Sequence, residues 1–83
     1  MATKKNNKAQ VVGFLGVGLD SRDGHRRVTR TENFVLVGGS EETHSHMQDV
    51  SIRFNEALGQ RGKRLQDTSL GEVVDLMHRA MER

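Results

Sequence analysis

The hydrophobic positions of the chain follow two different periods, and the change from one to the other falls at a pair of glycines. Residues 34–37 form an uninterrupted apolar run, Gly38-Gly39 follows, and from Ser40 onward the apolar residues recur at three- and four-residue intervals. An uninterrupted run of β-branched and aromatic residues favours a strand buried on both faces, whereas the longer interval is typical of a helix. We therefore predict a strand, a sharp glycine turn and a helix.

Two helices are predicted, near residues 40–60 and 69–82. Ser40 and Ser69 are good N-cap residues, and the glutamates that follow them suit the positive end of a helix dipole. Each helix has an apolar stripe, so we expect the second helix to pack antiparallel or obliquely on the first. The stripes are Met47, Val50, Phe54, Ala57 and Leu58 in the first helix, and Leu70, Val73, Val74, Met77 and Met81 in the second.

Two strands are predicted before the helices, near residues 10–20 and 28–37, and both are rich in Val, Phe and Leu. Between them, Asp23-Gly24 is the strongest hairpin signal in the chain, because glycine tolerates the positive φ that tight hairpin turns require. The expected fold class is therefore α+β: a β-hairpin followed by two α-helices (ββαα), in a small single domain over residues 10–83.

Both alternating faces of the predicted hairpin are apolar toward its open end. The helices can cover one of these faces, so the other must meet something else, and a second copy of the chain is the simplest partner. A lone two-stranded hairpin is also at best marginally stable in water. We therefore expect a homodimer in which two hairpins form one larger sheet or pack face to face. The expected core is Val11, Leu15, Val17, Phe34, Leu36, Val50, Phe54, Leu58, Val73, Val74 and Met77.

The composition narrows the class of protein further. A chain of 83 residues has a small core, and chains of this size often gain stability from a partner subunit. There is no cysteine, which excludes disulfides and thiolate metal sites and is compatible with the cytosol. No apolar run approaches the ~20 residues that span a bilayer. We therefore expect a cytoplasmic protein with no membrane contact.

The formal net charge is only +2, but the basic residues are clustered. One cluster lies in residues 1–9, which we predict to be a disordered basic arm because they contain almost nothing to bury. Basic side chains on a two-stranded ribbon can follow phosphates, and a ribbon fits the major groove of DNA. The absence of Tyr and Trp argues against reading single-stranded RNA by base stacking. The predicted nucleic-acid-binding residues are Arg22, Arg26, Arg27, Arg30, Arg61, Lys63 and Arg64.

The main functional hypothesis is a small non-enzymatic protein that binds DNA or RNA through this hairpin tip and the arm. The alternative is a protein-interaction or scaffold module that acts as a homodimer, with no nucleic-acid role, through the sheet or the helix face bearing Ile52. The two hypotheses differ in salt dependence, because phosphate contacts release counterions. The order strand–helix–helix after Val28 resembles in outline a ribbon-helix-helix module, but the chain has an extra N-terminal strand and lacks a single short base-reading strand.

Other kinds of chemistry are less well supported by the residues. The turn at Gly38-Gly39-Ser40 resembles in outline a phosphate-binding turn, but the two glutamates that follow it would repel a phosphate. His44 and His46 each share a helix face with a glutamate, but a carboxylate-bridged metal site needs a second such pair, so we interpret them as exposed residues of the first helical turns. No nucleophile has a recognisable partner base. We therefore expect no enzyme, cofactor, metal or small-molecule substrate.

Overall fold

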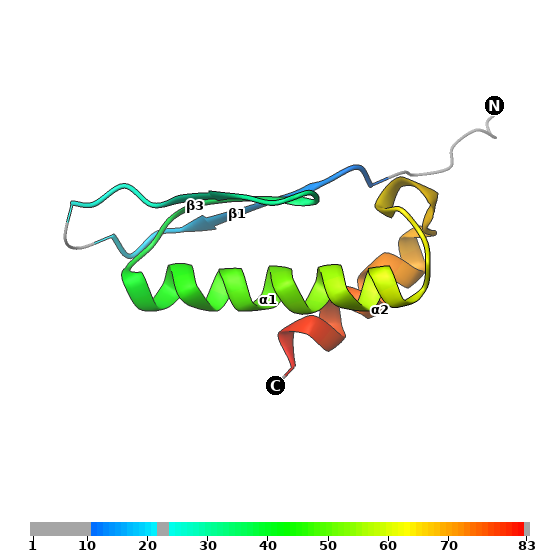
Figure 1. The fold of residues 1–83 in the computed structure, drawn as a ribbon. Coiled ribbons are helices and arrows are strands. Elements are labelled where there is room, and N and C mark those ends of the chain that lie inside the picture. Colours follow the sequence, from blue (N-terminus) through cyan, green and yellow to red (C-terminus); the bar gives the residue numbers. More distant parts are fainter. Residues whose placement is uncertain (1–10, 22–23, 83) are drawn as a thin grey trace, which may run out of the picture.

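A layer of β-sheet lies over a layer of helices in this protein (Figure 1). The computed structural model describes residues 11–21 and 24–82. Within these residues a three-stranded sheet precedes two α-helices, so the predicted α+β class is confirmed, although three strands replace the predicted hairpin. The elements are β1 (Phe14–Gly18), β2 (Val28–Arg30), β3 (Phe34–Gly38), α1 (Glu41–Gln60), the short 3-10 helix η1 (Leu65–Asp67) and α2 (Leu70–Met81).

The strand order in the described sheet is β1-β3-β2, so the most apolar strand is central. β1 runs parallel to β3, with Phe14 opposite Phe34, and β2 runs antiparallel to β3, with Val28 opposite Val37. The first strand therefore does lie beside residues 34–37 of the predicted second strand, but the two run parallel, so the predicted antiparallel hairpin is wrong. β3 lies between β1 and β2. As the most apolar strand, it is most stable in the centre of the sheet, where both its edges are hydrogen-bonded and the helices cover one of its faces.

The predicted strand over residues 28–37 is divided by a tight turn that joins β2 to β3. Thr31 makes this turn: its backbone N–H donates to the Phe34 carbonyl at 2.8 Å, and its Oγ1 accepts from the Phe34 N–H at 3.1 Å. In the predicted turn, Asp23 lies outside the described residues. Gly24 does have a positive φ of 72°, but it belongs to the loop between β1 and β2, which are not neighbours in the sheet.

Both predicted helices are confirmed to within one residue at each end. The Ser40 Oγ accepts from the Thr43 N–H at 3.2 Å, and the Ser69 Oγ accepts from the Glu72 N–H at 3.3 Å, as N-cap side chains do. Gly62, with φ 67°, turns the chain after α1. Neither helix of the described chain combines the length and apolar character that crossing a membrane requires.

The three phenylalanines of the chain meet in the core. The rings of Phe14 and Phe34 stack with centroids 4.9 Å apart, and the fully buried Phe54 meets both rings edge-on. Of the expected core, Phe34, Leu36, Val50, Phe54, Leu58 and Val73 are buried and Val11 and Met77 partly so. Leu15, Val17 and Val74 are exposed, so they were wrongly expected in the core, and Leu65, Leu76 and Ala80 take their place. Leu15 and Val17 alternate with the inward-facing residues of β1 and point to the other face of the sheet.

Candidate functional site

The loop after β1 is tied to the start of α1 by Asp20. Its carboxylate accepts hydrogen bonds from the Ser40 N–H at 2.9 Å, the Ser40 Oγ at 3.1 Å and the Thr43 Oγ1 at 2.7 Å. These bonds, first that of the Ser40 amide and then that of the Thr43 hydroxyl, lower the pKa of Asp20 to about 2. A carboxylate of the chain itself thus occupies the place where a phosphate-binding turn would hold its anion, and a tight turn with a capped helix is what this segment forms.

His44 is buried, not exposed as expected, and joins α1 to the sheet. Its Nδ1 lies 2.8 Å from the Gly38 carbonyl oxygen, its Nε2 lies 2.8 Å from the Thr29 Oγ1, and the Gln48 amide donates to the same hydroxyl at 2.9 Å. Because a carbonyl only accepts, Nδ1 carries the proton and Nε2 accepts from the hydroxyl of Thr29. Both ring nitrogens are therefore used in holding the fold. Within residues 11–21 and 24–82, no group of three His, Asp or Glu side chains is placed to hold a metal ion.

Only some of the predicted basic residues around the β1–β2 loop are exposed and therefore accessible to a nucleic acid. Arg26 and Arg30 are exposed and make no hydrogen bond or ion pair with the residues that the structure describes. Arg27 is half-buried, and its guanidinium donates to the Gly39 carbonyl at 3.2 Å, which fixes the loop against the start of α1. Arg22 lies outside the described residues. Arg30 ends β2, so the length of that strand separates it from Arg26.

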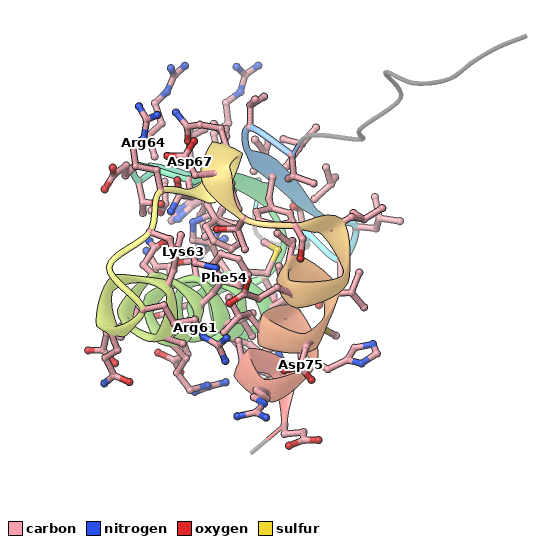
Figure 2. All side chains as sticks on the ribbon, turned by 90° about the vertical axis from the view of Figure 1, so that its right-hand side faces the viewer. Phe54, Arg61, Lys63, Arg64, Asp67 and Asp75 are labelled. Carbon is pink, nitrogen blue, oxygen red and sulfur yellow. The ribbon has the colours of Figure 1, made fainter. Side chains whose placement is uncertain are left out.

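The second predicted basic group lies at the other end of the molecule, after α1 (Figure 1, Figure 2). Glu72 of α2 accepts from Lys63 at 3.0 Å and also from Arg61, and these bonds, Lys63 first, lower the pKa of Glu72. Arg64 donates twice to Asp67, at 2.7 Å and 3.3 Å. Carboxylates thus offset much of the charge of this group. Among the predicted nucleic-acid-binding residues that the structure describes, Arg26 and Arg27 therefore lie at one end of the molecule and Arg61, Lys63 and Arg64 at the other (Figure 1).

The face of the sheet that points away from the helices is largely apolar, no helix or strand of residues 11–21 and 24–82 covers it, and we call it the outer face. Leu15 and Val17 of β1 are 68% and 54% exposed, and Val28 of β2 is 57% exposed. The strand register places the outward residues in two rows, Leu15-Val35-Arg30 and Val17-Val37-Val28. Contiguous apolar patches of this kind on small proteins often mark interaction sites. The sequence indicated such a face, and the structure identifies its residues.

An apolar groove of about 300 Å³ separates β1 from α2. Phe14 and Met47 line it from β1 and α1, and Met77 and Met81 line it from α2. A Cβ on Gly16 would lie 2.9 Å from the Leu36 Cδ2 and 3.2 Å from the Met47 Sδ, so the glycine allows β1 to approach the layer below closely. Figure 2 shows β1 and α2 on one side of the molecule and α1 on the other. We did not predict this groove from the sequence, in which the helical methionines were its one signal.

Comparison with protein families, with curated proteins and with solved structures gave no match for this chain. The outer face, the groove and the exposed arginines are therefore the features from which a function can be inferred.

Proposed function

We propose that this protein is a non-enzymatic interaction module that acts as a homodimer, with its sheet providing the interface. The outer face carries the proposal, because Leu15, Val17 and Val28 are all more than half exposed on the strands of one small sheet. Burial of apolar surface is worth about 25 cal/mol per Å². A complex in which a partner covers these side chains is therefore stabilised by burial of apolar surface that stays exposed to water in a single chain.

The size of the chain supports a partner of the same kind. A protein of 83 residues buries a smaller fraction of its surface on folding than a larger domain does, and association with a second copy is a common remedy. The chain has no cysteine with which to add a disulfide. The proposal includes a cytoplasmic location, which this absence permits.

Sedimentation equilibrium of the full chain over a wide concentration range tests the homodimer. We expect a mass of twice 9.3 kDa. Replacement of Leu15 and Val17 together by Ser should weaken self-association, whereas Ile52→Ser, at a comparably exposed position on α1, should leave it unchanged. A mass of 9.3 kDa at every concentration would contradict the homodimer, and dissociation by Ile52→Ser alone would move the interface to α1.

A second candidate function, binding to DNA or RNA, is favoured by the exposure of Arg26 and Arg30. Arg27 supports the fold, so the informative variant is Arg26→Ala with Arg30→Ala. Mobility-shift titrations at two salt concentrations should show weaker binding and a salt slope reduced by about two, roughly one per lost phosphate contact. The matched control is Arg61→Ala with Arg64→Ala, which removes cations already paired with carboxylates. No binding by the unmodified protein at low salt would exclude this second function.

A further inference from the structure

β1 is an edge strand whose outward hydrogen-bonding groups belong to its most exposed residues. The Phe14 N–H donates to the Asn33 carbonyl at 2.9 Å. Bonded residues alternate along a parallel strand, so the even-numbered residues of β1 are the ones that bond to β3. The N–H and C=O groups of Leu15 and Val17 then point away from the sheet. An exposed apolar edge of this kind is a template for another strand.

A second apolar stripe of α2 lies on the same side of the molecule as this edge. The first stripe, which is buried, is Val73, Leu76 and Ala80. The second stripe is Leu70, Val74, Met77 and Met81, and three of its members are 47%, 46% and 58% exposed, in the order Leu70, Val74 and Met81. Met77 and Met81 also line the groove beneath β1. Met77 and Met81 therefore connect the second stripe to the groove, and β1 and α2 lie on the same side of the molecule (Figure 2).

The sequence of β1 complements itself when two copies run antiparallel. The five residues of β1 overlap fully only when the pairing is centred on Gly16. Phe14 then lies opposite the partner's Gly18, so a large inward side chain meets a residue that has none. Leu15 lies opposite the partner's Val17, and both have their hydrogen-bonding groups at the edge. Gly16 meets the partner's Gly16 as a non-hydrogen-bonded pair, in which the Cα atoms approach to about 4.5 Å.

We infer that two copies of this protein join β1 to β1 antiparallel about a twofold axis at Gly16, which gives a continuous six-stranded sheet with the second stripes of both α2 helices in contact beneath it. This arrangement rests on the homodimer proposed above and places its interface at the edge of the sheet: Leu15 and Val17 become cross-strand neighbours of the partner's Val17 and the partner's Leu15, while Val28 stays at the far edge and the outer face of the joined sheet stays open. Of the inward positions of each added strand, Phe14, Gly16 and Gly18, only Phe14 carries a side chain, and it lies beside the partner's Gly18 at the edge of the groove. The new edge bonds involve the groups of Leu15 and Val17 that point away from β3.

The alternative dimer, in which the two outer faces pack against each other, would cover less of the exposed apolar surface than pairing through β1. β1 and β3 have five residues each and β2 has three, so at about 3.3 Å per residue and about 4.8 Å between strands the face measures roughly 200 Å², against about 800 Å² per partner in a standard interface. That packing also leaves the edge of β1 and the groove uncovered. Pairing through β1 adds the groove and the length of α2, whose 12 residues span about 18 Å.

A pair of proline variants separates the two edges of the sheet. Val17 and Val28 flank Val37 in the same row and are almost equally exposed. The Gly38 N–H donates to the Arg27 carbonyl, so the N–H of Val28, the next residue, points to the outer edge of β2 just as that of Val17 points to the outer edge of β1. Proline is tolerated on an edge strand where its nitrogen faces solvent.

In sedimentation equilibrium of the full chain, Val17→Pro should raise the dimer dissociation constant by about tenfold or more. The variant removes the hydrogen bond that the Val17 N–H donates to the partner's β1, and the twofold symmetry repeats this loss in the other copy. Val28→Pro should leave the constant unchanged. Circular dichroism of both variants checks that the helices are retained. If Val17→Pro does not fold, the cross-linking experiment below decides the question.

Cysteine cross-linking tests the register in a chain that has no cysteine of its own. In the inferred register, Leu15 faces the partner's Val17 with Cα atoms about 5.5 Å apart, which a disulfide spans. A mixture of Leu15→Cys and Val17→Cys chains should therefore oxidise to a covalent dimer, while neither variant alone should do so. A dimer that is unaffected by Val17→Pro and forms no mixed cross-link overturns the inference but keeps the homodimer. A monomeric unmodified protein overturns both.

Discussion

The carboxylate of Asp20 accepts a hydrogen bond from the backbone N–H of Ser40 at 2.9 Å, although 20 residues separate the two. Ser40 is at the same time the N-cap of α1, where its Oγ accepts from the Thr43 N–H. The bond therefore attaches the loop after β1 to the first turn of the helix. The carboxylate of Asp20 therefore holds the loop after β1 in place and also supports the first turn of α1.

Replacement of Asp20 by Asn should lower the melting temperature at pH 7, because Asn cannot accept hydrogen bonds as a charged carboxylate does. The pKa of Asp20 is lowered from 3.8 to about 2 in the folded protein. The stability that this group contributes is present above the unfolded value and is lost as the pH falls through the folded value. The difference in melting temperature between the two proteins should thus shrink from pH 4 to pH 2. Asp49→Asn, at an exposed position of α1, is the matched control for the loss of one surface carboxylate.

Gly38→Ala should destabilise the protein by about 2 kcal/mol, of which the left-handed backbone accounts for roughly 1 kcal/mol or more. Gly38 has φ 79°, and a Cβ there would lie 2.8 Å from the carbonyl oxygen of Gly18. Gly71→Ala provides the contrast, because a Cβ in this helical position meets nothing within 4 Å and should stabilise α2 by about 0.5–1 kcal/mol. Urea unfolding of both variants measures the two changes in the free energy of unfolding. If both variants were destabilised, or both stabilised, this account would be contradicted.

The helices could be predicted because their signals are local. Ser40 and Ser69 each cap the helix that begins at the next residue, and the apolar stripes repeat within one segment. The strand order could not be predicted, because it depends on the pairing of Phe14 with Phe34, which lies 20 positions further along the chain. The turn before β3 was also missed, since Thr31 makes it with its hydroxyl and no glycine or proline marks it.

The exposed arginines and the apolar outer face were partly predictable, since charge and alternation are written in the sequence. Their arrangement was not. Pairing of Glu72 with Lys63 and Arg61 brings together α2 and the segment after α1, and it offsets part of the charge of one predicted basic group. The groove likewise exists only because Met47 of α1 and Met77 of α2 come to lie under β1. Contacts between elements decide both features.

Phe54→Ala should destabilise the protein by about 3–5 kcal/mol, the usual cost of removing a buried aromatic ring. Phe54 is fully buried and touches the rings of both Phe14 and Phe34. Small proteins have about 5–15 kcal/mol of stability in total, so the variant should show a large drop in the midpoint of urea unfolding. Ile52→Ala, on the same helix but half exposed, should change stability by less than about 0.5 kcal/mol. A similar loss for both would contradict the core described for α1.

The hydrogen bond between His44 and Thr29 should appear as a coupling of about 1 kcal/mol in a double-mutant cycle. His44→Phe leaves the Gly38 carbonyl and the Thr29 hydroxyl without this partner, and Thr29→Val does the same to the Nε2 of His44 and the amide of Gln48. Each single change should therefore cost about 1–3 kcal/mol, the penalty for an unpaired buried polar group. The double variant should lose less than the sum, because the bond is already absent in each single variant. Urea unfolding at pH 7 of the four proteins gives the coupling. Additivity within about 0.3 kcal/mol would mean that His44 holds the sheet through the Gly38 carbonyl and packing alone.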